Sequence, residues 1–383
     1  MNKFFTYLRQ QFKTEMCVPL LMVTLFILTS PVWTHAAGNV QVIGVPNGGV
    51  TPDAEIDSQG IIHLVYVSGE KNVGEDVYYV KSVDNGKHFS PPIRVNSEAG
   101  TAHPGGAYRG PDIAVGKANQ VHVVWYVNAY QRKLPKNQWG VFYAHLNASE
   151  TAFVAARNLN RLPSDNYSLA ADGNGKVAVL WTAGKAYMNL SNDGGKTFSS
   201  TVTVEKADPC ECCATRAYFS TSGNLYFAYR DKAENMRDMY LMTLTDGHEA
   251  FSREKLSATP WKIEGCPMTG TYLTGRFTTQ SGKGENLVAG WETKGEIYFA
   301  HLSPDGGLRP PGEIKVAEFG KYPVVLTASD GTTLVAWKNG LKLEWRMYDG
   351  NGKPKGGLES APVDNSHRLA GVVTMVGDFL LFP

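Results

Sequence analysis

A repeated apolar segment constrains the fold of this 383-residue chain more than any other feature. Short runs such as QVHVVWY and NLVAGW recur at intervals on the order of 50 residues, and each contains an aromatic residue near its end. The aromatic positions are Tyr66, Trp125, Trp181, Tyr229, Trp291 and Trp337. Each run follows a strand-like piece and a glycine-containing turn, and further strand-like pieces come after it. Units of four short strands at this spacing predict the blades of a β-propeller.

The repeat predicts an all-β fold, a six-bladed β-propeller of four-stranded antiparallel blades. The blades are expected to begin near residues 51, 111, 167, 216, 270 and 322. The C-terminal run HRLAGVVTMVGDFLLFP has the pattern of two further strands, which can pair with NVQVIGV near the N-terminus and close the ring. This closure can complete the six blades or form a composite seventh blade. Residues 38–383 are expected to form a single domain.

The first 37 residues have the layout of a cleaved signal peptide. Lys3, Arg9 and Lys13 precede the apolar run CVPLLMVTLFILTS, and the small residues of THAAG follow it. Because the run is shorter than the roughly 20 residues of a spanning helix, no transmembrane span is expected after cleavage. The predicted location is therefore periplasmic or secreted. The net charge of +1, with no basic patch along the sequence, argues against a nucleic-acid partner.

Two turns carry the same spaced motif, S-x-D-x-G-x-x-F, at the same place in their repeats. Its residues are Ser82, Asp84, Gly86 and Phe89 in one turn, and Ser191, Asp193, Gly195 and Phe198 in the other. We expect the aspartate to accept hydrogen bonds from turn amides, the glycine to be left-handed and the ring to pack inward, which is a structural role. The motif resembles the Asp-box, or BNR repeat, of the sialidase (neuraminidase) superfamily. The blade pattern extends this resemblance over the mature chain.

The order of the strands in a blade decides which loops share a face. Links between blades lead into the innermost strands, so we expect them to gather at the mouth of the central channel, opposite the motif turns. Two consecutive links, DPCECCATRAY and WKIEGCPMTGTY, carry all four cysteines that remain after signal cleavage: Cys210, Cys212, Cys213 and Cys266. The same mouth is predicted to hold a binding pocket formed by His103, Tyr108, Arg109, Asp112, Asp165, Arg216, Asp231, Tyr322 and Arg368.

The cysteine cluster is consistent with three kinds of chemistry. In an exported protein it can form disulfides, with one C-x-C-C cysteine bonded to Cys266 and with Cys210 and Cys213 left as a C-x-x-C-like pair. It can instead bind a soft metal ion, copper or zinc, through its thiolates. Further ligands to that ion would come from Met268, His103 or His367. The third alternative is a reactive thiol or redox pair. Without a metal, no cofactor is expected.

The resemblance implies a glycosidase pocket. In such a pocket three arginines hold the substrate carboxylate, a tyrosine is the nucleophile and an aspartate is the acid/base. The matching candidates here are Arg109, Arg216, Arg230 and Tyr322, with Asp53, Asp112 or Asp165 as the acid. The chain departs from the family pattern at its first blade, which begins TPDAEID without the Arg-Ile-Pro motif. In addition, no glutamate is clearly placed beside Tyr322.

The leading functional hypothesis from the sequence is an exported propeller that binds a ligand at its central mouth, with a soft metal ion held by the cysteine cluster. The alternative is an exo-glycosidase of the sialidase type, which would act on acidic glycans and would carry its cysteines as disulfides. A plain interaction scaffold is the third hypothesis. At this stage the chain is not assigned as an enzyme or as a non-enzyme.

Overall fold

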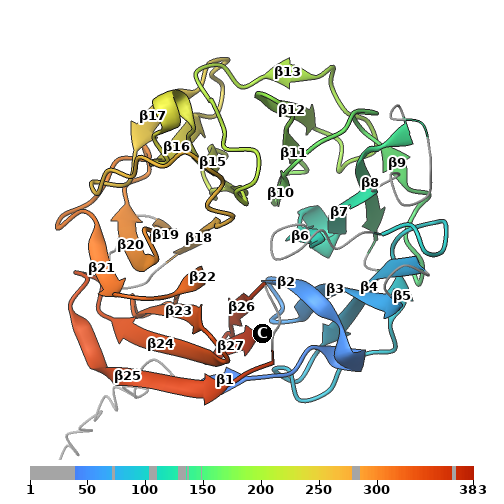
Figure 1. The fold of residues 1–383 in the computed structure, drawn as a ribbon. Coiled ribbons are helices and arrows are strands. Elements are labelled where there is room, and N and C mark those ends of the chain that lie inside the picture. Colours follow the sequence, from blue (N-terminus) through green and yellow to red (C-terminus); the bar gives the residue numbers. More distant parts are fainter. Residues whose placement is uncertain are drawn as a thin grey trace, which may run out of the picture. The chain divides into compact units, whose positions relative to one another are not determined.

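The computed structural model describes residues 39–70, 74–102, 110–127, 135, 138–147, 149–277, 285–364 and 368–383. These residues form seven β-sheets arranged as the blades of a propeller (Figure 1). The predicted signal peptide lies outside the described residues. None of the residues described belongs to a helix with the length and apolar character needed to span a bilayer.

The first three blades are four-stranded and antiparallel, and each runs from the innermost to the outermost strand in chain order. Their strands are β2 (Val50–Ile56), β3 (Ile62–Glu70), β4 (Gly74–Ser82) and β5 (Ile93–Arg94); β6 (Asp112–Val115), β7 (Val121–Val127), β8 (Gly140–Leu146) and β9 (Arg157–Asn158); and β10 (Tyr167–Ala171), β11 (Val177–Thr182), β12 (Ala186–Ser191) and β13 (Val202–Thr203).

The next three blades repeat this order. Their strands are β14 (Arg216–Phe219), β15 (Leu225–Arg230), β16 (Met239–Leu244) and β17 (Ser252–Lys255); β18 (Thr271–Phe277), β19 (Glu285–Thr293), β20 (Glu296–Leu302) and β21 (Ile314–Ala317); and β22 (Lys321–Thr327), β23 (Thr333–Asn339), β24 (Lys342–Tyr348) and β25 (Pro354–Pro362). Short 3-10 turns at η1 (Pro46–Gly48), η3 (Lys117–Asn119) and η5 (Ala233–Asn235) lie between strands. The innermost strands begin within one residue of the positions expected from the sequence repeat.

The expected number of six blades is wrong, because the described residues form a seventh sheet. Strands β26 (Ala370–Val373) and β27 (Phe379–Phe382) form its antiparallel hairpin, and β1 (Val40–Val42) joins β27 in parallel. The C-terminal run thus pairs with the N-terminal strand as expected, but as a blade of its own. The sequence left a composite seventh blade open as the alternative, and the repeat alone does not decide it because the strands come from both ends of the chain and form no continuous four-strand unit.

The repeated aromatic residues form the core between the blades. All six lie on the second strand of their blade and are at most 2% exposed. Trp125 shares a hydrophobic cluster with Val65 of the preceding blade, and Trp291 shares one with Leu241. The blades therefore stack face to face through these rings, as packed sheets do.

The innermost strands surround the central channel. Strands β2, β6, β10, β14, β18, β22 and β26 pack each against the next, and β26 packs against β2. Because the first six blades run outward from their first strand and the seventh is entered through β26, the links between blades enter at the same mouth. This is the mouth at which the sequence places the cysteines.

The two motif turns are held by local hydrogen bonds. In the first turn, Asp84 accepts bonds from the Ser82 hydroxyl at 2.8 Å and from the His88 amide at 3.0 Å. The Gly86 amide donates to the Ser82 hydroxyl at 2.9 Å, with a φ of 81° at Gly86. The second turn repeats these bonds around Asp193. Both aspartates are therefore occupied by the backbone of their own turns.

Asp193→Ala should destabilise the third blade by about 1 kcal/mol, because it removes bonds from the Thr197 amide and hydroxyl. Chemical denaturation of the variant measures this loss. Asn192→Ala, at an exposed neighbour in the same turn, is the matched control and should leave the stability unchanged. Equal stability of both variants would argue against the structural role of the motif.

Candidate functional site

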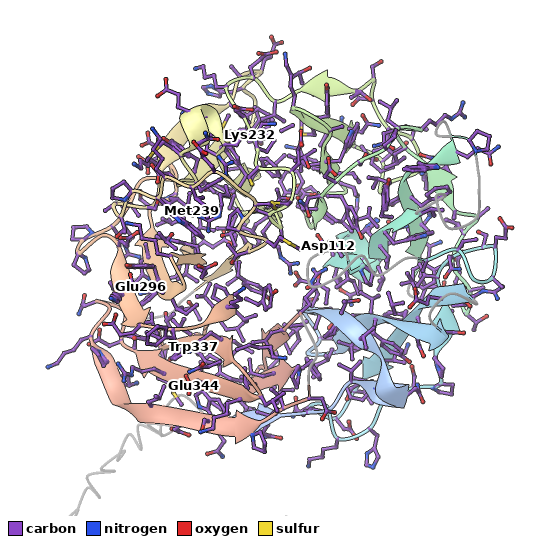
Figure 2. All side chains as sticks on the ribbon, viewed as in Figure 1. Asp112, Lys232, Met239, Glu296, Trp337 and Glu344 are labelled. Atoms are coloured by element: carbon purple, nitrogen blue, oxygen red, sulfur yellow. A yellow bond between two sulfur atoms is a disulfide. The ribbon has the colours of Figure 1, made fainter. Side chains whose placement is uncertain are left out.

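A pocket at the channel mouth is lined by the first residues of the innermost strands. The lining comprises Asp112, Tyr167, Ala214, Thr215, Arg216, Gly270, Thr271, Tyr272, Tyr322, Pro323, Arg368 and Leu369. Six of the seven blades contribute, and Asp112 lies near the centre of the ring (Figure 2). The propeller thus brings side chains that are far apart in the sequence into one concave site.

The floor of the pocket is a buried cluster of two guanidinium and two carboxylate groups. Arg216 donates two parallel hydrogen bonds to Asp53, at 2.8 and 3.0 Å, and lies 3.5 Å from Asp112. Arg368 donates to Asp112 and lies 3.5 Å from Asp53. Because Asp53 and Asp112 are 1% and 4% exposed, these charges compensate one another away from water.

Three tyrosines form the walls of the pocket. The Tyr272 ring lies 4.9 Å from the Arg216 guanidinium, and the Tyr167 hydroxyl donates to the Gly110 carbonyl at 2.8 Å. Tyr322 has a φ of 54°, which is rare for a residue with a bulky side chain. It sits in a register shift of β22 between Lys321 and Val324. Strained backbone of this kind is concentrated at functional sites, which makes Tyr322 a candidate for a functional role.

A second cavity of about 470 Å³ lies further along the channel. Arg216 and Tyr272 line both cavities, so they separate the mouth pocket from this inner cavity. Glu55 of β2 lines the inner cavity, two residues after Asp53. Burial raises the pKa of Glu55 to about 7, although the charge of Arg216 acts in the opposite direction.

The raised pKa of Glu55 predicts how stability depends on pH. Its folded-state pKa of about 7 exceeds the usual 4.5, so the folded protein binds more protons between these values. The free energy of unfolding should therefore fall as the pH rises through this window, by at most about 3 kcal/mol. Glu55→Gln should remove the fall, as measured by denaturation at a series of pH values. Glu254→Gln, at an exposed site, should retain it.

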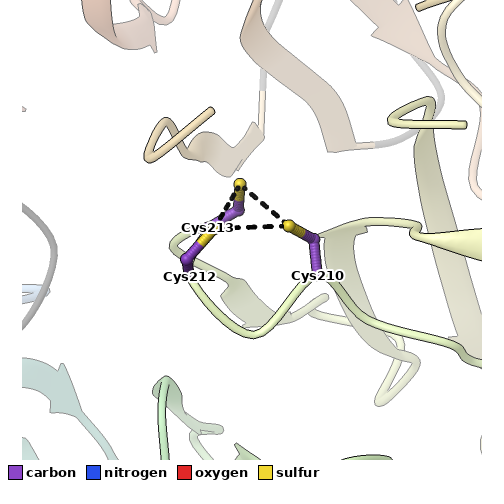
Figure 3. Close-up of side chains that lie close together, drawn as sticks. All are labelled: Cys210, Cys212 and Cys213. Atoms are coloured by element: carbon purple, nitrogen blue, oxygen red, sulfur yellow. Dashed lines mark hydrogen bonds between the residues drawn. The ribbon is translucent and has the colours of Figure 1, made fainter. Parts of the chain in front are cut away.

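The two cysteine-bearing links meet at the mouth. A disulfide joins Cys212 to Cys266, whose Cα atoms lie 6.2 Å apart, and Cys210 and Cys213 are buried free thiols. This confirms the expected arrangement in which one C-x-C-C cysteine pairs with Cys266. The Cys210, Cys212 and Cys213 sulfurs point toward one another (Figure 3), and all lie within 4.8 Å of each other. No metal binding follows from this geometry alone, because the disulfide occupies one of the three sulfurs.

The two free thiols differ in their surroundings. A hydrogen bond from the Cys213 thiol lowers the pKa of Cys210 to about 6, and the charges of Arg237 and Arg230 act in the same direction. Burial raises the pKa of Cys213. The pair is thus polarised, with Cys210 as the sulfur that more readily becomes a thiolate.

Other candidates from the sequence lie outside the pocket lining. Arg230 is 1% exposed and donates to the carbonyls of Arg237 and Glu292. Asp231 forms an ion pair with Arg253 at 3.0 Å, and the amide of Asp165 bonds to the Thr182 carbonyl. Met268 is 46% exposed. The candidates His103, Tyr108, Arg109 and His367 fall outside the described residues.

Sequence reasoning missed Tyr167, Tyr272 and Glu55 as parts of the channel. The available signal was the blade register, because Tyr167 and Tyr272 lie at the start of innermost strands and Glu55 lies near the end of one. Asp53 was predicted as an acid, and its pairing with Arg216 was not foreseen.

Several solved structures have a fold similar to that of this chain. A polysaccharide lyase, an ulvan lyase, matches 85% of this chain and 87% of its own, with a TM-score of 0.52 and 15% identity. The same kind of lyase bound to -[GlcA(1-4)Rha3S]- matches 88% of each chain, with a TM-score of 0.51 and 13% identity. The NanB sialidase of Streptococcus pneumoniae, in a complex with Optactamide, matches 78% of this chain and 66% of its own, with a TM-score of 0.50 and 10% identity.

The chain has a sialidase-like propeller fold. No known family profile and no curated protein matches its sequence. At these identities the likeness concerns the fold alone, and a shared fold does not fix a function. The chemistry of the mouth pocket, and not the fold, therefore decides which functions this sialidase-like propeller can have.

Proposed function

We propose that this protein is an exported carbohydrate-active enzyme that binds a glycan in the mouth pocket and hydrolyses a glycosidic bond there. The observation that carries the proposal is the lining of the pocket, to which Tyr167, Tyr272 and Tyr322 contribute together with Arg368 and Asp112. Ligand sites typically combine apolar and aromatic walls with a few fixed polar groups. This pocket combines tyrosine side chains with charged groups that can bond to the hydroxyl and acidic substituents of a sugar.

The charged groups suit recognition by directed hydrogen bonds. Arg216 and Arg368 balance Asp53 and Asp112 in charge, so the pocket does not attract anions by net charge. A guanidinium still offers a planar fork that matches a carboxylate or sulfate group. Acidic glycans are therefore the first substrates to test. The structural relatives support this choice, because they include a lyase bound to a sugar repeat that contains a uronic acid and a sulfate.

Tyr322 is the residue we assign to the reaction. It lies on the pocket wall in a strained conformation, next to the floor that Asp112 and Arg368 form. Its phenol oxygen would attack the anomeric carbon as the glycosidic bond breaks, and the phenol's proton would pass to the leaving-group oxygen. Water would then cleave the tyrosyl–sugar bond, which releases the sugar and restores the phenol. Arg216 and Asp53 would hold the floor in place, since their charges are already paired with each other.

An assay of acidic polysaccharides tests this proposal. Wild-type protein should release new reducing ends from at least one of them, and Tyr322→Phe should lower the rate at least about 100-fold. Phe319→Ala, at a ring that is 74% exposed in the same link, should keep the wild-type rate. Release of unsaturated uronate would assign elimination in place of hydrolysis. No cleavage of any glycan would contradict the enzymatic proposal.

A second candidate function is the binding of a soft metal ion, copper or zinc, by the cysteine cluster. It is favoured by the three sulfurs that lie within 4.8 Å of one another, and it requires reduction of the Cys212–Cys266 disulfide to free the Cys212 thiolate. Elemental analysis of the protein isolated from its exported compartment tests it. About one ion per chain, lost in Cys213→Ser, would support this candidate, and a metal-free protein would contradict it.

A further inference from the structure

The four cysteines of the two links form a chain of sulfur atoms from the surface to the interior. Glycan cleavage at the mouth pocket makes no use of them. We propose that they form a thiol–disulfide relay, in which one disulfide moves between the outer pair Cys212–Cys266 and the inner pair Cys210–Cys213. The inference assigns these residues a redox site that is separate from the sugar-binding groups.

The distances between the sulfurs allow each exchange step. The Cys210 sulfur lies 3.4 Å from the disulfide-bonded Cys212 sulfur, and the Cys213 sulfur lies 3.5 Å from that of Cys210. Thiol–disulfide exchange proceeds by attack of a thiolate on a disulfide sulfur, and both contacts place the reacting atoms next to each other. No rearrangement of the link is needed to bring a thiol to the disulfide.

Burial gives the relay a direction. Cys266 is exposed and Cys212 is partly buried, whereas Cys210 and Cys213 are 5% and 0% exposed. An external thiol or disulfide therefore meets the outer pair first. The inner pair exchanges through Cys212, because the surrounding protein covers Cys210 and Cys213.

A buried positive charge lies beside the inner pair. The Arg230 guanidinium bonds to two backbone carbonyls and stacks on the Trp261 ring at 5.0 Å. Among the residues that the structure describes, no carboxylate lies within ion-pair distance of it, and its Nε atom has no hydrogen-bond partner. The Cys210 amide donates to the Arg230 carbonyl at 2.7 Å, which holds the cysteine turn against this strand. Glu292 and Asp238 lie close enough to act on its charge, and the Cys210 and Cys213 sulfurs are the thiols that its charge acts on. A buried cation at this place stabilises a thiolate.

The exchange conserves atoms and electrons. The Cys210 thiolate attacks the Cys212 sulfur, a Cys210–Cys212 bond forms, and the Cys212–Cys266 bond breaks with its electron pair leaving on Cys266. Cys266 then takes a proton from water. Cys213, after releasing its proton to water, attacks the Cys210 sulfur, and Cys212 leaves as a thiolate that is protonated in turn. One disulfide is present before and after, so no oxidant or reductant is required.

Disulfide mapping of the intact protein tests the relay. Wild-type protein is treated with chelator and limiting dithiothreitol until it has two free thiols per chain. It is then acid-quenched, alkylated and digested for mass spectrometry. Both Cys212–Cys266 and Cys210–Cys213 isomers should be found, and Cys266 should react with iodoacetamide before quenching. In Cys210→Ser the outer disulfide should persist, and alkylation of Cys266 should slow at least about tenfold.

Cys213→Ser gives a second test, because it blocks the last step and should trap the Cys210–Cys212 bond. Circular dichroism of each variant checks that the fold is kept, and the wild-type mapping does not depend on any variant. A single isomer in the wild-type protein, with Cys266 unreactive until full reduction, would overturn the relay. Two disulfides that do not exchange with the added thiol would overturn it as well. Neither result bears on glycan cleavage, which the polysaccharide assay tests separately.

Discussion

Arg216→Met should lower the free energy of unfolding by about 3–5 kcal/mol, the cost of removing one partner from a buried ion pair. The variant leaves Asp53, at 1% exposure, without the guanidinium that donates two of its hydrogen bonds. Among the residues that the structure describes, Arg368 is then the remaining arginine that contacts both Asp53 and Asp112. Equilibrium denaturation in urea measures the loss.

The matched control for Arg216 is a surface ion pair. Lys315 bonds to Glu296 and Glu318 at an exposed site, so Lys315→Met should leave the free energy of unfolding nearly unchanged. A double variant, Arg216→Met with Asp53→Asn, should recover part of the stability because it removes the unpaired charge as well. If Arg216→Met is as stable as the wild-type protein, the cluster is not the structural floor of the pocket.

Cys212→Ser should have the second largest effect, a loss of about 2–4 kcal/mol. The disulfide to Cys266 closes a sequence separation of 54 residues, so its removal gives the unfolded chain more freedom. A bond between Cys210 and Cys213 closes a far shorter loop and should compensate little. Denaturation with and without reductant measures the loss, and the variant should be insensitive to reductant. A reductant effect in Cys212→Ser as large as that in the wild-type protein would contradict this explanation.

The sequence predicted the elements that repeat and the contacts that follow from the repeat. The six aromatic positions and the starts of the innermost strands could be read from the period alone. The same period placed Cys212 and Cys266 on neighbouring links, which the disulfide bears out. A blade is a local unit, so its pattern is visible in a continuous stretch of sequence.

The sequence could not predict contacts between distant blades. Asp53 and Arg216 are 163 residues apart, and they meet because their strands begin on opposite parts of one narrow channel. The pairing of Val40 with Phe379 is also long-range, but it was expected because both chain ends carry strand-like runs. The positive φ of Tyr322 lies in a register shift of β22. No pattern of residues in the sequence predicts such a shift.

The most direct test of the mouth pocket as a glycan site is calorimetric titration of an acidic oligosaccharide from the cleaved polysaccharide, or of an oligouronate. Wild-type protein and Phe319→Ala should bind it with the same affinity. Tyr322→Ala should weaken binding at least about tenfold, because it removes one wall of the pocket. Equal binding by Tyr322→Ala and wild-type protein would contradict the account, since the sugar would then be held away from the mouth pocket.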